Sequence, residues 1–90
     1  MARVAIVTGG SRGIGEAISL ALQAEGMTVA ATYAGNDERA RQFTERTGID
    51  TYKWDVADFD ACVAGVAQVE SELGPVDVVV NNPASPATAP

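Results

Sequence analysis

The stretch Thr8-Gly9-Gly10-Ser11-Arg12-Gly13-Ile14-Gly15 follows a short apolar segment, residues 4–7, and leads into a segment with the apolar spacing of a helix. A glycine-rich turn between a first strand and a helix is the usual place for a dinucleotide pyrophosphate. Glycines let the backbone turn tightly and approach a phosphate closely. The helix N-terminus adds unpaired N–H groups and the positive end of its dipole. The stretch therefore predicts a nucleotide site rather than an ordinary strand–helix connection.

The spacing of the glycines in this turn is T-G-x-x-x-G-x-G. Three residues separate its first two glycines, whereas the common dinucleotide fingerprint has a single residue there. The chain contains no G-x-x-x-x-G-K-[ST] pattern, which excludes a P-loop. The cofactor contacts predicted in this first loop are Gly9, Ser11, Arg12, Gly13, Ile14 and Gly15.

Composition bounds the class of protein. The chain has 90 residues, enough for one small domain, and its net charge of −6 argues against nucleic acid as a partner. No apolar run approaches the roughly 20 residues of a membrane span. Cys62 is the single cysteine, so no internal disulfide forms and a cytoplasmic location is expected. The absence of histidine excludes a histidine general base and a His/Cys metal cluster.

Strand and helix patterns alternate along the chain. Strands are predicted at 3–8, 27–33, 50–54 and 76–80, with helices at 13–25, from Asn36 or Asp37 to 46, and after a cap at Asp58. The third helix has apolar residues at helical spacing: Cys62, Val63, Val66, Val69 and Leu73. This order predicts an α/β Rossmann-type half, a four-stranded parallel sheet of order 3-2-1-4 with helices on both faces. The domain covers residues 1–82, and the proline-rich residues 83–90 are predicted to form an unstructured tail.

The loop after the second strand bears on the choice of cofactor. In such folds an acidic residue there favours NAD, whereas an arginine favours the 2′-phosphate of NADP. The strand ends without an acidic residue, and Arg39 follows shortly, facing Arg12 of the glycine turn. We therefore predict NADPH, with Tyr33, Asn36 and Arg39 among its contacts.

An alternative remains for this second loop. Arg39 and Arg41 would then lie on a solvated helix face, with Arg41 paired to Glu45 four residues later. Asp37 and Glu38 stand next to Arg39 and weaken the case for a phosphate site.

Polar residues also follow the third and fourth strands. The Asp55 carboxylate is predicted to accept a hydrogen bond from the adenine amino group, with Val56 against the ring; alternatively Asp55 only starts a turn. Asn81 and Asn82 would either hold neighbouring loops through their amides or reach the cofactor ribose.

These pieces in order resemble the amino-terminal half of the short-chain dehydrogenase/reductase family: T-G-G-S-R-G-I-G, the second loop, W-D-V and V-D-V-V-V-N-N. The resemblance covers Met1 to Asn82. Within the family it is closest to acetoacetyl-CoA reductases and 3-oxoacyl-acyl-carrier-protein reductases, through T-Y-A-G-N-D-E and K-W-D-V-A-D-F-D. It implies NADPH-dependent reduction of 3-oxoacyl thioesters. The implied contacts are Gly9, Gly13 and Gly15 at the pyrophosphate, Arg12 and Arg39 at the 2′-phosphate, Asp55 and Val56 at the adenine, and Asn81 beside the adenosine ribose.

The chain also departs from the family pattern. The family motif N-N-A-G reads Asn81-Asn82-Pro83-Ala84 here, so its glycine is lost. The family's catalytic tyrosine lies four residues before a lysine, but the only lysine is Lys53 and Ile49 stands four residues before it. The alternatives are therefore an NADPH-binding half of a reductase, a non-catalytic nucleotide-binding module and an inert truncation product.

The tail suggests an origin for the truncation. Relatives often continue A-G-I-T-R-D-G-T, and deleting one base from GC-rich codons for that stretch yields P-A-S-P-A-T-A-P. That is the sequence from Pro83 to Pro90, which favours a frameshift over an engineered linker.

The fourth strand, residues 76–80, is predicted to form a flat edge of the sheet whose only charge is Asp77. An unpaired edge of this kind is a template for another strand. A homodimer or larger assembly is therefore expected, with two copies paired antiparallel through this strand.

Overall fold

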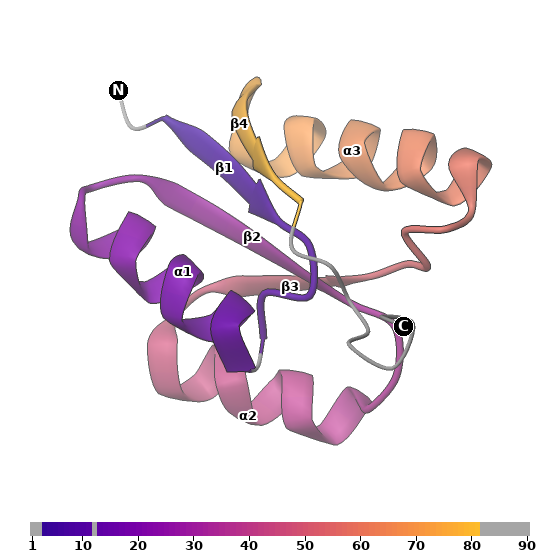
Figure 1. The fold of residues 1–90 in the computed structure, drawn as a ribbon. Helices are drawn as coiled ribbons and strands as arrows, with labels where there is room; N and C mark the ends of the chain where they lie inside the picture. The colour runs from indigo at the N-terminus through magenta and orange to yellow at the C-terminus, as the bar shows by residue number, and fades with distance from the viewer. Residues whose placement is uncertain (1–2, 12, 82–90) are drawn as a thin grey trace, which may run out of the picture.

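The computed structural model describes residues 3–11 and 13–81. Strands and helices alternate along the described part of the chain (Figure 1). The elements are β1 (Val4–Val7), α1 (Gly13–Ala24), β2 (Thr28–Tyr33), α2 (Asp37–Thr47), β3 (Asp50–Lys53), α3 (Phe59–Leu73) and β4 (Val76–Val80). The predicted tail at residues 83–90 lies outside the described residues.

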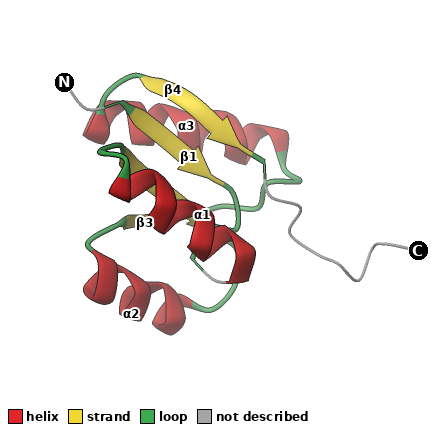
Figure 2. Ribbon diagram, turned by 60° about the vertical axis from the view of Figure 1, so that its left-hand side comes forward, coloured by secondary structure: helices red, strands yellow, loops and turns green. Residues whose placement is uncertain are grey.

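The four strands form one parallel sheet in the order β3-β2-β1-β4, which confirms the predicted topology. Helices α1 and α2 cover one face and α3 covers the other, as Figure 2 shows with α1 in front of the strands and α3 behind them. The carboxyl ends of all four strands therefore lie along one edge of the sheet, where α/β folds bind their ligands.

The core is divided between the two faces of the sheet. On the α3 side, Val4 and Ile6 of β1 pack with Val69, which is fully buried. On the α1 and α2 side, Val7 packs with Phe43, also fully buried. Because β1 is buried on both faces, its sequence is an uninterrupted apolar run rather than an alternating one.

The helix ends follow the predicted signals. The Asn36 side chain accepts a hydrogen bond from the Arg39 backbone N–H at 2.9 Å, so Asn36 rather than Asp37 is the cap of α2. Asp58 caps α3 by accepting from the Ala61 N–H at 3.1 Å. Gly48 ends α2 with a φ of 76°, in the left-handed region that favours glycine.

The prediction of a flat β4 edge was wrong. Val4 pairs with Val76 but Ala5 pairs with Val78, so Asp77 is an extra, bulged residue between them. Its carboxylate accepts a hydrogen bond from the Val4 N–H at 3.2 Å. A bulge bends and twists its strand, which limits the regular part of β4 to Val78–Val80.

The prediction for α3 was also wrong at one position of its packing face. Val63 is 54% exposed, whereas Val66 and Leu73 pack against the core around Val69. Cys62 is half-buried, and its thiol donates to the Val56 carbonyl oxygen at 3.3 Å. No helix among the residues that the structure describes is long and apolar enough to cross a membrane.

Candidate functional site

The candidate site lies along the carboxyl edge of the sheet, where the loops after β1, β2, β3 and β4 meet (Figure 1). Of the predicted contacts, Arg12 lies outside the described residues, as does Asn82. The parallel sheet brings the other predicted positions to this one edge: Gly9, Ser11, Gly13, Ile14, Gly15, Tyr33, Asn36, Arg39, Asp55, Val56 and Asn81.

The backbone of the glycine turn has the conformation that the motif requires. Gly9 and Gly13 have φ angles of 62° and 60°, which residues with a Cβ rarely adopt. The Gly9 N–H donates to the Thr32 hydroxyl, and the Gly10 N–H donates to the Thr32 carbonyl oxygen, each at 3.2 Å. Thr32, which is buried near the end of β2, thus fixes the first half of the turn from the neighbouring strand.

Ser19 fixes the second half of the turn from inside α1. Its fully buried hydroxyl lies 2.9 Å from the carbonyl oxygens of both Gly10 and Gly15 and can donate to either of them. A Cβ on Gly10 would lie 2.8 Å from the Ser19 hydroxyl and 2.8 Å from the Val7 carbonyl oxygen. Gly10 is therefore required by packing.

Gly10, Ser19 and Thr32 were not predicted as site residues. Gly10 stands at a variable position of the motif, although the Gly9-Gly10 pair was a usable signal of close packing. For Ser19 and Thr32 the sequence carries no local signal, because their partners lie on other elements of the fold.

The N-terminus of α1 points into this edge from the end of the turn. The helix begins at Gly13, and the N–H groups of its first turn have no partner within the helix. Ile14 is 74% exposed, whereas Ser11 and Gly15 are buried. A backbone that offers N–H groups at a helix N-terminus suits an anionic group such as a pyrophosphate.

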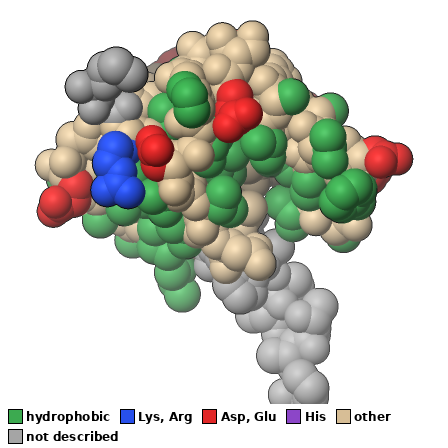
Figure 3. Space-filling view, turned by 90° about the horizontal axis from the view of Figure 1, so that it is seen from above, with side chains coloured by type: hydrophobic (Ala, Val, Ile, Leu, Met, Phe, Trp, Pro, Cys, Tyr) green, Lys and Arg blue, Asp and Glu red, His purple; other side chains and the backbone are tan. Residues whose placement is uncertain are grey.

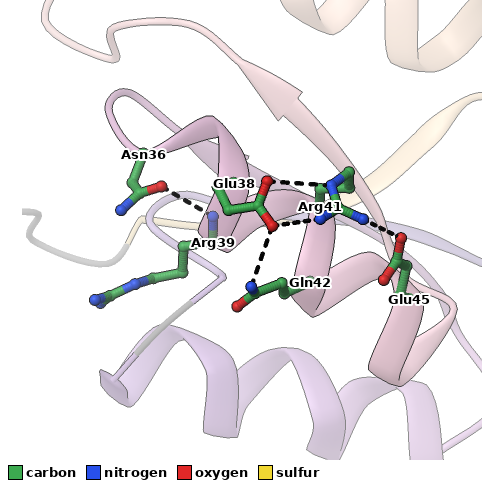
Figure 4. A network of polar contacts seen from close by, with 6 residues as sticks. All are labelled: Asn36, Glu38, Arg39, Arg41, Gln42 and Glu45. Carbon is green, nitrogen blue, oxygen red and sulfur yellow. Dashed lines mark hydrogen bonds and ion pairs between the residues drawn. The ribbon is translucent and has the colours of Figure 1, made fainter.

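Glu38, the acidic residue directly before Arg39, is bound to other partners (Figure 4). Glu38 pairs with Arg41 and also accepts a hydrogen bond from Gln42 at 3.2 Å. The hydrogen bond from Arg41 and its charge hold the pKa of Glu38 below its usual value. Arg41 also pairs with Glu45, as the alternative interpretation predicted for that residue.

Asp37 is likewise bound. Its carboxylate lies 3.2 Å from the Lys53 ammonium and accepts a hydrogen bond from the Tyr33 hydroxyl at 3.0 Å. The hydrogen bonds from Lys53 and Tyr33 hold the pKa of Asp37 below its ordinary value. The pKa of Tyr33 is raised, first by burial and then by Asp37.

Arg39 itself is exposed, and its guanidinium forms no ion pair with any of the residues that the structure describes. Figure 4 shows its side chain extending away from the Glu38–Arg41–Glu45 group, on the side where Asn36 lies. The two neighbouring carboxylates that weakened the sequence argument are therefore occupied elsewhere, and Arg39 is available to an external anion.

Asp55 occupies a turn, as the alternative interpretation predicted. Its carboxylate accepts from the Ala57 N–H at 2.9 Å, and its carbonyl oxygen accepts from the Asp58 N–H at 2.9 Å. The side chain remains exposed, and Val56 beside it is 37% exposed. The turn uses one carboxylate oxygen and leaves the loop accessible to a ligand.

Asn81 holds the neighbouring loop. Its side-chain oxygen accepts a hydrogen bond from the Thr8 hydroxyl at 3.3 Å, and the Thr8 N–H donates to the Val80 carbonyl oxygen at 3.0 Å. This contact ties the end of β4 to the start of the glycine turn, which is one of the two roles predicted for this asparagine.

The chain matches the family model described as short chain dehydrogenase over residues 3–90. It is 72% identical over 82 residues to acetoacetyl-CoA reductase of Paracoccus denitrificans, and the match covers 91% of this chain and 34% of that protein. It is 44% identical over 87 residues to a 3-oxoacyl-acyl-carrier-protein reductase FabG of Staphylococcus aureus, with 91% and 35% covered. The chain thus spans about a third of the length of these relatives.

Solved structures share the fold. A variant of actinorhodin polyketide ketoreductase, determined with NADPH, matches with a TM-score of 0.81 and 37% identity. The match covers 90% of this chain and 33% of the ketoreductase.

Proposed function

Since the chain belongs to the short chain dehydrogenase family, we propose that it is the NADPH-binding part of a reductase that acts on 3-oxoacyl thioesters. The names of the acetoacetyl-CoA and 3-oxoacyl-acyl-carrier-protein reductases support this substrate class. The family's oxidoreductases use nicotinamide cofactors, and one structural relative was determined with NADPH.

The observation that carries the choice of NADPH is the guanidinium of Arg39, which has no ion-pair partner among the described residues and lies at the same edge as the glycine turn. In this proposal the backbone N–H groups at the start of α1 hold the pyrophosphate. Arg39 grips the 2′-phosphate by paired, charge-assisted hydrogen bonds. Asp55 and Val56 meet the adenine, with Asn81, Tyr33 and Asn36 lining the adenosine side.

The proposal predicts that the 90-residue chain binds NADPH more tightly than NADH. The two cofactors differ only by the 2′-phosphate, so the preference isolates the contribution of the contacts to this phosphate. Calorimetric titration of the chain with each cofactor measures it. Equal affinities, or no binding of NADPH at millimolar concentration, would overturn the proposal.

The two tyrosines of the chain are poorly suited to donate a proton to a substrate. When bound, NADPH supplies the hydride for a carbonyl, and an acid must then protonate the oxygen. The Tyr52 hydroxyl donates to Glu72 at 2.7 Å, and its pKa is raised by burial and then by Glu72. Tyr33 is bound to Asp37 in the same way. This favours the second candidate for the chain alone, a non-catalytic nucleotide-binding module.

We therefore expect no reductase turnover from the isolated chain. The measurement is NADPH absorbance during incubation with acetoacetyl-CoA, with an intact relative such as the Paracoccus denitrificans acetoacetyl-CoA reductase as positive control. Steady consumption that requires the thioester and disappears in Gly13→Val would contradict this prediction.

We also propose that the chain self-associates through β4, two copies forming one continuous sheet. Among the described residues β4 pairs only with β1, and Val79 is 60% exposed. Figure 3 looks down on the side that carries β4 and α3, where hydrophobic side chains reach the surface between a few acidic groups. A two-fold axis would bring Val79 of each copy together, with the seam formed by Val78–Val80, the part of β4 beyond the bulge.

Sedimentation at high micromolar concentration is expected to show a dimer or a larger species. Val79→Lys should shift it toward the monomer, because like charges would meet at the seam. Ala64→Lys, at an exposed position of α3, is the matched control and should leave the assembly unchanged. A wild-type monomer at every concentration would refute self-association.

A further inference from the structure

Trp54 stands between β3 and the loop that carries Asp55 and Val56. Its backbone N–H donates to the Tyr33 carbonyl oxygen at 3.1 Å, which extends the contact between β2 and β3 by one residue. Its ring packs on the α3 side of the sheet against the core cluster around Val69. It is the only tryptophan of the chain.

The Trp54 ring fits against Gly65 in the middle of α3. A Cβ on Gly65 would lie 2.2–2.5 Å from three atoms of the ring, Cε3, Cδ2 and Cζ3. Any residue other than glycine at this position would therefore displace the Trp54 ring. A glycine inside a helix costs roughly 0.5–1 kcal/mol relative to alanine. Gly65 is therefore a helix-interior glycine at a position that faces the tryptophan ring.

A second cost is present at the same contact. The indole N–H of Trp54 is buried and has no hydrogen-bond partner within the part of the chain that the structure describes. An unsatisfied buried donor is unfavourable, and leucine or phenylalanine would avoid it. The indole ring thus occupies this position although its N–H has no partner among the described residues. Local rules broken together at one contact are typical of a functional constraint.

The contact fixes the loop that follows. Asp55 turns the chain through its hydrogen bonds to Ala57 and Asp58, and the Cys62 thiol holds the Val56 carbonyl oxygen. The loop is thus fastened to Trp54 at one end and to the first turns of α3 at the other. Gly65 lies further along the same helix, so the ring packs against both the sheet and the middle of α3.

We propose that Trp54 and Gly65 are positioning residues that set the base selectivity of the adenine site. By fixing Asp55 and Val56, they allow the carboxylate to accept a hydrogen bond from the 6-amino group of adenine while Val56 lies against the ring. The inference rests on the proposed NADPH site. It adds that the site distinguishes adenine from a purine with a 6-oxo group, and that this discrimination depends on the ring–glycine contact.

The experiment compares NADPH with its hypoxanthine analogue, deamino-NADPH, by calorimetry on the 90-residue chain. The ratio of the two dissociation constants isolates the 6-amino contact. Wild type is expected to favour NADPH about tenfold, the effect of one hydrogen bond to a charged group. Gly65→Ala should reduce the ratio to about twofold or less, because the added methyl displaces the ring.

Two further variants separate positioning from general destabilisation. Ala64→Gly weakens α3 at an exposed neighbouring position and should keep the tenfold ratio. The double variant Trp54→Phe/Gly65→Ala has a smaller ring at position 54, which makes room for the methyl group at position 65. It should recover at least half of the wild-type preference for NADPH over deamino-NADPH. If Gly65→Ala does not fold, Trp54→Phe alone serves, with the ratio expected to fall by half or more.

The outcomes distinguish the two proposals. Absence of NADPH binding by wild type would overturn the proposed function and the inference with it. Tight NADPH binding with equal affinity for the analogue would leave the proposed function standing and refute base selectivity. A tenfold ratio that persists in folded Gly65→Ala, or in Trp54→Phe, would refute the positioning role.

Discussion

Replacing Gly10 with alanine is expected to lower the free energy of unfolding by about 1–3 kcal/mol, the usual cost of overpacking. The added Cβ would meet the Ser19 hydroxyl and the Val7 carbonyl oxygen at 2.8 Å and the Ala31 methyl at 3.0 Å. The carbonyl belongs to β1, at the centre of the sheet, and cannot move without disturbing its pairing with β2 and β4. The change should shift the turn as well, so NADPH affinity should fall together with stability.

Urea denaturation followed by circular dichroism measures this effect. Gly35→Ala is the matched control, since a Cβ there meets nothing within 4 Å and its φ is not in the left-handed region. The control should change the free energy of unfolding by less than about 0.5 kcal/mol. Equal stability of the Gly10→Ala variant and the wild type would show that the turn is more loosely packed than described.

Replacing Arg39 with alanine is expected to raise the dissociation constant for NADPH about tenfold to a hundredfold, as the loss of a charge-assisted contact to phosphate does. The constant for NADH should stay nearly unchanged, because NADH has no 2′-phosphate. The guanidinium is exposed and has no ion-pair partner among the described residues, so its removal leaves no carboxylate unpaired. Stability should therefore be unaffected.

Arg46→Ala is the control for this experiment. It removes an equal charge from the same helix, seven residues away, and leaves the Glu38–Arg41 and Lys53–Asp37 pairs beside Arg39 in place. NADPH affinity should change by less than about threefold, the range of screened long-range charge effects. Equal losses of NADPH and NADH affinity in Arg39→Ala would show that Arg39 does not recognise the 2′-phosphate.

Most of the fold could be predicted from the sequence because its determinants are local. Largely apolar segments specify β1 and β2, while Asn36, Gly48 and Asp58 cap helices through neighbours three or four residues away. The alternation of these elements then predicts a parallel sheet with right-handed crossovers, and the strand order follows from a Rossmann-type half. The glycine turn was predictable for the same reason, since Gly9 and Gly13 need left-handed φ angles.

Contacts between distant residues were not predictable. The bulge at Asp77 depends on the Val4 N–H, 73 positions away in the chain. The fit of Trp54 against Gly65 exists only once β3 and α3 are packed together. No periodicity in the sequence records such pairings, because each partner alone fits an ordinary strand or helix pattern.

The pairing of charges in the candidate site was only partly predictable. The Arg41–Glu45 pair follows from helical spacing, and it was foreseen as an alternative. The Lys53–Asp37 pair joins β3 to α2 and could not be read from spacing. It is this second pair, together with Glu38–Arg41, that leaves Arg39 without an acidic partner among the described residues, and so decides which arginine is available to a phosphate.

The most direct test of the central claim, a dinucleotide site at the carboxyl edge of the sheet, is an amide chemical-shift map of the isotope-labelled chain titrated with NADPH. The largest changes are predicted for the amides of residues 9–15, 36–39 and 55–57, with those of 9–15 shared by NADH and those of 36–39 much smaller with it. Changes that centre on the opposite edge of the sheet, around residues 26–28, 48–50 and 74–76, would contradict it.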